Sequence, residues 1–207
     1  MHTEEVRFLN NLAVLLDCGR PLEASLRALK EECPRDGREG RDGREAGAGD
    51  RCCAAYDALI ERVRTGGEFT DVLGDYPELC SRAPLALLRA GRRSGMLEAV
   101  LPKAARLVRA SCEGEWDPAR RFYEWWAVMA ESGIDSRSAL EVLEADFART
   151  PFGEVANGLR AGIAKGKHLH EAAVDFPEFF TAAARDLLHY GESRNLARAL
   201  RAICQLV

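Results

Sequence analysis

The chain has 207 residues, which is enough for one large domain or for two domains of about 100 residues each. Hydrophobic residues make up 47% and charged residues 30% of the sequence, a balance that excludes an intrinsically disordered chain. The formal net charge of −4 gives no general reason to expect a surface for nucleic acids or anionic membranes. Ala, Leu, Arg and Glu dominate and favour helices, whereas β-branched residues are sparse, so we expect an all-α fold.

The first half predicts six helices that are separated by glycine or proline. Apolar residues recur at helical spacing over 8–16, and Gly19 is expected to end that helix before Pro21 opens the second over 22–29. Further helices are predicted over 55–63, over 70–73 with Thr70 as the cap, over 82–90 with Gly91 as the stop, and over 96–111.

A charged, glycine-rich stretch separates the second and third of these helices. Residues 34–49 contain the sequence RDGRE twice and have almost no apolar side chains to bury. We therefore expect a mobile loop over 34–50.

The second half predicts the same series of helices. Asp117-Pro118 is expected to start the first of them, on which Phe122, Trp126 and Met129 face inward, and Gly133 is expected to end it.

Self-comparison of the two halves indicates an internal duplication. At a spacing of 114 residues, 7–29 aligns with 121–143, and at a spacing of 100 residues, 66–99 aligns with 166–199. The change in spacing falls in the glycine-rich stretch. We therefore predict tandem duplicated helical bundles of about six helices each, in domains 1–113 and 114–207.

The cysteines and the apolar runs bear on the cellular compartment. The seven cysteines are odd in number and form no C-x-x-C pair, which favours a reducing cytoplasm over a disulfide framework. Adjacent Cys52 and Cys53 have two interpretations, a redox or metal feature or small residues at a helix start, and we favour the second. The N-terminus lacks a basic signal region. The longest run without a charged residue, 8–16, has nine residues, against roughly 20 in a membrane helix.

The order of these motifs resembles that of a known family. The first half contains Phe8, Asp17-Cys18-Gly19, Pro21-Leu22, Gly66 to Phe69, Pro77 and Gly91 to Leu97. The second half contains Phe122, Glu131-Ser132-Gly133, Gly166 to Leu169, Pro177, Phe179-Phe180 and Gly191 to Leu196. Together they resemble the GspF/PilC family, the inner-membrane platform proteins of type II secretion and type IV pilus machines. The family's G-E-x-x-G-x-L motif is altered in both halves, since Arg92 stands in the Glu place and Asn195 in the second Gly place.

The resemblance implies a non-enzymatic scaffold or adaptor that works in the cytoplasm. The family's membrane helices have no counterpart in the sequence, because residues 112–118 join the two copies directly. The implied partners are proteins, such as a secretion-type ATPase or components of a pilus or secretion assembly, and a homodimer is a further candidate. No cofactor is expected. The alternative hypothesis is a regulatory module that binds a small ligand or a cation at acidic helix ends.

Catalytic chemistry finds little support in the sequence. The histidines are His2, His168, His170 and His189, and no G-x-S-x-G, Walker A or H-E-x-x-H motif occurs. A spacing of two places His168 and His170 on different sides of a helix, so we expect solvated side chains rather than metal ligands. Recurring acidic positions at helix ends are candidate ligands for a hard cation, or caps for neighbouring helices. The cation candidates are Asp17, Glu131 and Glu192.

Two other sets of side chains are candidates for partner binding. Neighbouring aromatic residues on a helix cannot both face one core, so we expect one of the pair Trp125-Trp126 and one of the pair Phe179-Phe180 at the surface, and we select Trp125 and Phe179. Arg89, Arg92 and Arg93 lie beside the first glycine motif and could bind an acidic partner, although a solvated face is the alternative.

Overall fold

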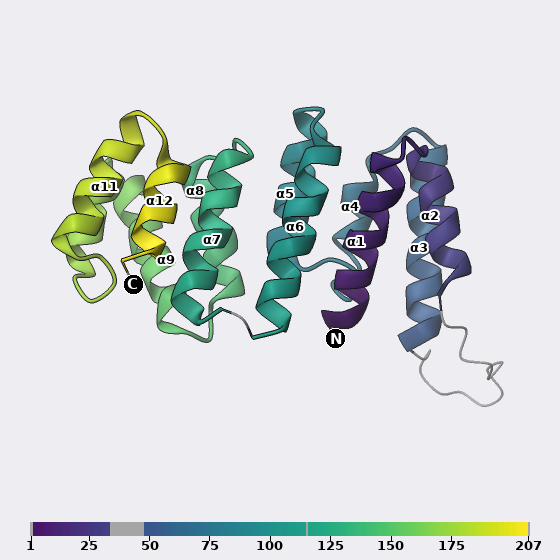
Figure 1. The fold of residues 1–207 in the computed structure, drawn as a ribbon, viewed down its shortest axis with the longest axis horizontal. Coiled ribbons are helices and arrows are strands. Elements are labelled where there is room, and N and C mark those ends of the chain that lie inside the picture. Colours follow the sequence, from purple (N-terminus) through teal and green to yellow (C-terminus); the bar gives the residue numbers. More distant parts are fainter. Residues whose placement is uncertain (1, 34–47, 115, 207) are drawn as a thin grey trace. The chain divides into compact units, whose positions relative to one another are not determined.

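The protein is described by a computed structural model that covers residues 2–33, 48–114 and 116–206. Over these ranges the chain forms twelve α-helices and one 3-10 turn, without a strand (Figure 1). The prediction of an all-α fold is therefore confirmed. The helices divide between two compact units, 1–108 and 109–207. The predicted limits of the two domains, at 113 and 114, remain a prediction.

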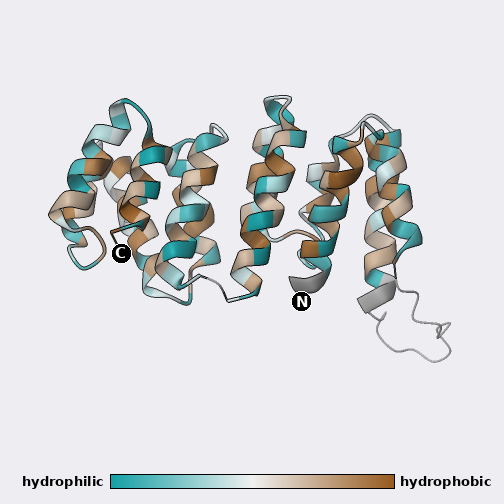
Figure 2. Ribbon diagram, viewed as in Figure 1, coloured by the Kyte–Doolittle hydropathy of each residue, from teal (hydrophilic) through white to brown (hydrophobic). Residues whose placement is uncertain are grey.

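The first unit contains five complete helices and most of a sixth. These are α1 (His2–Asp17), α2 (Leu22–Glu31), α3 (Ala48–Arg64), α4 (Phe69–Leu73), α5 (Arg82–Arg93) and α6 (Leu97–Cys112). Successive helices from α1 to α5 contact one another. Apolar residues alternate with hydrophilic ones along each helix, so that one side of it can be buried (Figure 2).

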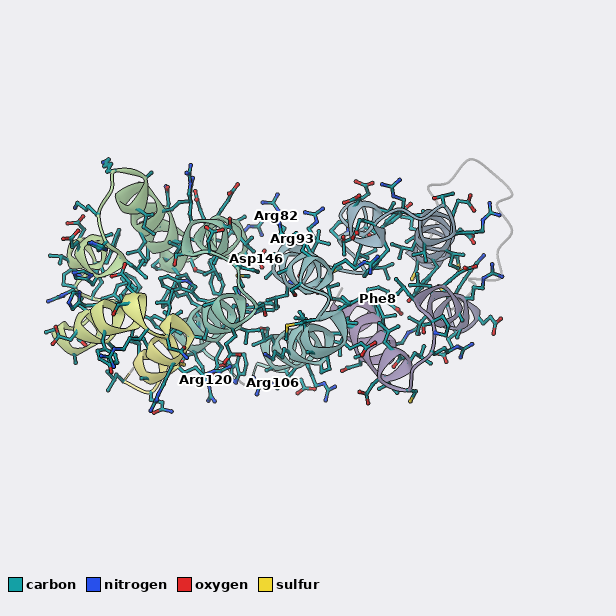
Figure 3. All side chains as sticks on the ribbon, turned by 90° about the horizontal axis from the view of Figure 1, so that it is seen from above. Phe8, Arg82, Arg93, Arg106, Arg120 and Asp146 are labelled. Carbon is teal, nitrogen blue, oxygen red and sulfur yellow. The ribbon has the colours of Figure 1, made fainter. Side chains whose placement is uncertain are left out.

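The core of the first unit includes side chains from α1 and α3. Phe8 is fully buried on α1, as Figure 3 illustrates, and its ring lies 6.1 Å from that of Tyr56. The buried carboxylate of Glu5 accepts hydrogen bonds from the Ser81 backbone N–H at 2.6 Å and from its hydroxyl at 2.7 Å. Glu5 thereby ties α1 to the start of α5. Arg82 on α5 and Arg106 on α6 are exposed (Figure 3).

The helices of the first unit differ from the predicted ones in three respects. The short helix α4 begins at Phe69 with Glu68 at the N-cap, and Thr70 is buried within it, so the cap prediction was wrong. Helix α5 continues through Gly91 and ends at Arg93. The predicted mobile loop over 34–50 lies outside the described residues as far as 47, and α3 already begins at Ala48.

The second unit repeats this order of helices. It contains α7 (Pro118–Glu131), α8 (Ser136–Asp146), α9 (Pro151–Ala164), α10 (Leu169–Ala172), the 3-10 turn η1 (Ala173–Asp175), α11 (Ala182–Ser193) and α12 (Leu196–Cys204). Helix α7 packs against α8, α9 and α12, and α10 packs against α9 and α11. Asp117 caps α7 by accepting the Arg120 N–H at 2.8 Å, so the predicted start of this helix is confirmed.

An aromatic cluster fills the core of the second unit. Phe122 is fully buried, and its ring lies 5.1–5.6 Å from the rings of Tyr123, Trp126, Phe147 and Phe152. Such edge-to-face and tilted contacts add about 0.5–1.5 kcal/mol per pair to the area that the rings bury. Helix α7 therefore carries a large share of the core of this unit.

Gly91 and Gly191 occupy equivalent places, each buried inside the helix that precedes the last helix of its series. A Cβ at Gly191 would lie 2.5 Å from the Cβ of Ala199 on α12, and a Cβ at Gly91 would lie 3.0 Å from the Cβ of Val100 on α6. Both glycines thus permit close helix contact, whereas the sequence analysis took Gly91 for a helix stop. The turn that follows α5 instead contains Gly95 at a φ of +69°, which favours glycine.

Replacement of Gly191 by Ala should lower the free energy of unfolding by about 1–3 kcal/mol, because the added methyl group collides with Ala199. Urea denaturation measures the loss. In the double variant G191A/A199G the collision disappears, so its loss should be smaller than the two single losses added together. Additive losses would contradict the close contact between α11 and α12.

Asp135 provides a second test, because it caps α8. Its carboxylate accepts the Ser138 N–H at 3.0 Å and the Ser138 hydroxyl at 2.7 Å, and these hydrogen bonds hold the pKa of Asp135 below its usual range. Asp135→Ala should cost about 1 kcal/mol at neutral pH. Since the folded-state pKa is depressed, this stabilisation is present above the unfolded-state pKa of about 3.9 and is lost as the pH falls through the folded-state pKa.

Urea denaturation of both proteins at several pH values measures this difference, which should shrink once the pH falls below about 4. Asp135→Asn keeps a capping oxygen that does not titrate and serves as the control, since its difference in stability from Asp135→Ala should not change with pH. A difference between Asp135→Ala and the natural protein that is equally large in acid would contradict the role of the charged cap.

Candidate functional site

Each unit has a surface groove beside the glycine that permits close helix contact. The first groove, here called the first corner, has a volume of about 400 Å³. It is lined by Leu16, Gly19, Arg20, Pro21, Leu22, Arg92, Gly95, Leu97 and Glu98. These residues come from the junction of α1 with α2 and from the junction of α5 with α6. The first corner therefore brings together three of the first-half motifs, those around Gly19, at Pro21-Leu22 and over Gly91 to Leu97, but not Phe8, Gly66 to Phe69 or Pro77.

Guanidinium groups dominate the charges at and beside the first corner. Nε of Arg92 lies 3.4 Å from a carboxylate oxygen of Glu68, and Nη2 of Arg89 donates to the backbone oxygen of Thr70 at 3.3 Å. Arg20, Arg89 and Arg92 are exposed. Such exposed ion pairs exchange partners at little cost, so the guanidinium groups remain available to an anionic partner.

The groove of the second unit, here called the second corner, also has a volume of about 400 Å³. It is lined by Ser136, His168, His170, His189, Glu192, Ser193 and Leu196. Three of the four histidines in the chain thus lie in one groove. They come from the start of α10 and from α11, two elements that pack against each other.

Glu192 organises the second corner. One carboxylate oxygen accepts the backbone N–H of Leu169 at 2.5 Å, and the other lies 2.6 Å from Nδ1 of His170. The Glu192 side chain is only 22% exposed. Its carboxylate therefore satisfies a backbone group at the start of α10 and fixes the position of the His170 ring.

The three histidines are close together. Nδ1 of His189 lies 3.4 Å from Nδ1 of His170, and the rings of His168 and His170 are stacked with centroids 5.5 Å apart. The prediction that His168 and His170 point to different sides was wrong. His168 is the N-cap of α10 with an extended backbone, at φ −66° and ψ 156°, so helical geometry does not apply to the pair.

The predicted acidic cation ligands do not share a site within the described part of the chain. One carboxylate or imidazole atom each from His170, His189 and Glu192 lies within 4.8 Å of the others, and this group includes neither Asp17 nor Glu131. Glu131 forms an ion pair with Arg201 of α12, and Asp17 is exposed at the end of α1. Of the three predicted cation ligands, only Glu192 lies in a cluster of potential ligands.

The aromatic candidates for partner binding are less exposed to solvent than the sequence predicts. Trp125 is buried, at 5% exposure, and its Nε1–H donates to the Ser111 hydroxyl at 3.4 Å. The expectation that one residue of the pair Trp125-Trp126 is exposed was therefore wrong, because α7 is covered on several sides. Phe179 is half-buried against Phe152 at 5.0 Å, whereas Phe180 is fully buried.

Cys33 joins the adjacent cysteines that the sequence analysis noted. Its side chain is hydrogen-bonded to those of Cys52 and Cys53, and burial is the largest cause that raises the pKa of Cys33 well above its ordinary value. Burial likewise raises the pKa of Cys52. The thiols of Cys33 and Cys52 are therefore protonated at neutral pH, which disfavours nucleophilic chemistry at these two residues.

The two corners correspond along the chain at a spacing of 100 residues. In this alignment Glu68 meets His168, Thr70 meets His170, Arg89 meets His189 and Arg92 meets Glu192. Corresponding positions thus contact each other in both units, but the side chains differ in charge. Histidines that stand opposite Glu68, Thr70 and Arg89 are the signal in the sequence that would have indicated the second corner.

The fold and the grooves define the class of protein. It is an all-helical protein of two units, and each unit has a groove beside a glycine that permits close helix packing. The family model for Type II secretion system (T2SS), protein F matches residues 8–118, and the chain belongs to this family. It is also 31% identical over 94 residues to the Type II secretion system protein F of Vibrio cholerae serotype O1, a match that covers 45% of this chain. The matched stretch spans 20% of that relative's length.

A membrane-spanning helix requires length and low charge together. Among the described residues, no helix of the protein meets both requirements for crossing a membrane.

The corresponding positions Glu192 and Arg92 should differ in their contribution to stability. Glu192→Ala removes the acceptor of the Leu169 N–H and should lower the free energy of unfolding by about 1–3 kcal/mol. Arg92→Ala removes a 3.4 Å ion pair at the surface and should cost less than about 1 kcal/mol. Urea denaturation compares the two, with Glu192→Gln as the variant that keeps an acceptor. Equal losses for both alanine variants would contradict this role of Glu192.

Proposed function

We propose that this chain is a non-enzymatic protein-interaction module of the type II secretion and type IV pilus kind, built from two tandem copies of one helical domain. The observation that carries the proposal is the family match over residues 8–118, on a fold whose exposed groove contains the family's glycine motif. A family defined by a component of a secretion machine supports a role in assembly through protein contacts.

The proposal of two tandem copies is supported by backbone features that recur in both units. Gly19 and Gly133 follow the first helix of each series with φ of +76° and +77°, and Gly66 and Gly166 follow the third helix with φ of +76° and +84°. These values favour glycine, so the same residue is required at the same step of each series. Membership of the first copy in the family then extends to the second as an inference.

The first corner is the proposed partner surface. Arg20 and Arg92 present guanidinium groups at a groove that apolar Leu16 and Leu22 also line, and the exposed Arg89 lies three residues before Arg92 on α5. Arginine combined with an apolar surface is typical of residues that contribute most to binding energy at protein interfaces. We therefore infer a partner with an acidic, partly apolar surface. A secretion-type ATPase in the cytoplasm is the first candidate, and a second copy of this chain is the other.

The test is light scattering coupled to size exclusion of the full chain, alone and mixed with the secretion-type ATPase of the same source. We expect a complex whose affinity falls at least about ten-fold in the double variant R89E/R92E, because reversed charges repel an acidic partner. Isothermal titration calorimetry measures the affinity.

The matched control is Arg64→Glu, since Arg64 is exposed and forms an ion pair with Glu61 on its own helix α3. This variant should bind as the natural chain does. Absence of a complex with the ATPase, or equal weakening by Arg64→Glu and by R89E/R92E, would overturn the assignment of the first corner. Elution of the chain as a dimer that R89E/R92E dissociates would assign the corner to a second copy.

A further inference from the structure

We propose that His170, His189 and Glu192 bind a divalent first-row transition-metal ion, with zinc as the ion to test. This inference goes beyond the proposed function and does not depend on it, because no step in it uses a protein partner. The site belongs to the second corner alone.

The three ligand groups already surround one point. The Nδ1 atoms of His170 and His189 are 3.4 Å apart, and the three ligand atoms lie within 4.8 Å of one another. Metal–nitrogen and metal–oxygen bonds of about 2.0–2.2 Å in a tetrahedral site place neighbouring ligand atoms roughly 3.4 Å apart. The two imidazole nitrogens therefore have the required separation. The Glu192 oxygen, at 2.6 Å from His170, needs to withdraw by less than about 1 Å.

Protons alone cannot give His170, His189 and Glu192 good hydrogen bonds to one another. A proton on Nδ1 of His170 can be donated to Glu192 at 2.6 Å, but then His170 offers no lone pair to His189 at 3.4 Å. If Nδ1 of His189 is unprotonated, its lone pair faces the His170 N–H at a distance too long for a short hydrogen bond. If Nδ1 of His189 is protonated, two N–H groups face each other. A cation between the groups accepts lone pairs from all three and satisfies each of them.

The surroundings of Glu192 suit a metal ligand. One of its oxygens is held by the Leu169 N–H at 2.5 Å, which leaves the other oxygen directed at the histidines. Hydrogen bonds of this kind orient metal ligands, and loss of such an outer-shell partner typically costs 10–100-fold in metal affinity. His189 and Glu192 are three residues apart on α11 and therefore lie on one face of that helix.

The types of ligand select the class of ion. Two imidazoles and one carboxylate are typical of zinc and of neighbouring divalent transition metals, whereas calcium and magnesium prefer oxygen ligands alone. Three protein ligands leave at least one position for water or for another side chain. The candidate from this chain is His168, whose Nδ1 lies 4.0 Å from the Glu192 carboxylate and whose side chain is 72% exposed.

The first corner provides an internal comparison. At the positions that correspond to His189 and Glu192 the first unit has Arg89, beside the first corner, and Arg92, within it, and guanidinium groups have no lone pair to offer a metal. Arg92 instead supplies a positive charge beside Glu68, at 3.4 Å. A bound cation would play the corresponding electrostatic part in the second corner.

Isothermal titration calorimetry of the untagged full chain with zinc chloride is the first measurement, because a histidine tag would bind the metal itself. We expect one zinc equivalent assigned to the second corner, and no heat from calcium chloride at that site. His189→Ala and Glu192→Gln should each weaken this zinc equivalent by at least about 100-fold, since loss of even an outer-shell partner costs 10–100-fold. His189 is exposed, so its variant should fold normally.

Two control variants isolate the site. Arg89→Ala alters the corresponding position of the first corner and His2→Ala removes the histidine outside the cluster, so both should bind zinc as the natural chain does. Cobalt(II) absorption separates histidine from cysteine ligands. We expect d–d bands without thiolate-to-cobalt charge transfer for the equivalent that His189→Ala removes.

The outcomes decide the proposal. Loss of one zinc equivalent in His189→Ala and Glu192→Gln, with retention in both controls, supports it. Zinc binding that is unchanged in His189→Ala overturns the proposal, and a cobalt(II) spectrum with thiolate charge transfer for every bound equivalent places the ion at the cysteines and overturns it too. Absence of any zinc binding to the natural chain overturns it as well.

Discussion

Close contact between two consecutive helices at a buried glycine is the constraint on which both corners depend. Gly191 faces α12 and Gly91 faces α6 at separations that leave no room for a side chain. Successive residues on an α-helix are rotated by about 100°. When the glycine faces the last helix of the series, the next residue, Glu192 or Arg92, is therefore turned toward the neighbouring short helix. The hydrogen bond from Glu192 to Leu169 and the ion pair from Arg92 to Glu68 follow from this placement.

The short helix α10 is the other half of the second corner, and α4 is the corresponding helix beside the first corner. The backbone N–H groups at the start of a helix have no partner within the helix and need an acceptor. Glu192 supplies one to Leu169, whereas the corresponding Arg92 cannot accept and interacts with the Glu68 side chain instead. A change of charge on α11 relative to α5 is thus matched by a change at the N-cap, from Glu68 to His168. Local electrostatic complementarity is kept while the chemistry of the groove changes.

The sequence was sufficient for the helices and for much of their order. Gly19 and Gly133 have positive φ, and Asp117 caps the helix that Pro118 opens, so local chemistry fixed these ends. Gly91 could not be interpreted in this way. A glycine that ends a helix and a glycine that permits close packing look alike until the neighbouring helix is known.

The candidate site was harder to predict because it depends on contacts across elements. Glu192 was selected, but with Asp17 and Glu131 rather than with His170 and His189, since acidic positions were compared between copies and histidines were not. Trp125 was expected at the surface from its neighbour alone, although α7 is covered on several sides. The His168–His170 pair was judged by helical geometry that ends at the N-cap. Each error concerns packing that local sequence patterns do not encode.

The difference between the buried core and the exposed corners would let one fold serve both of the proposed kinds of binding. Gly91, Gly191 and the aromatic cluster around Phe122 are buried, so a change there costs packing energy. Arg92, at 44% side-chain exposure, forms an ion pair whose loss costs little. Corner residues can therefore change from guanidinium groups to imidazoles while the helices keep their arrangement. Because the glycine fixes the direction of the following residue, each such change is presented to the same groove, where a partner or an ion can interact with it.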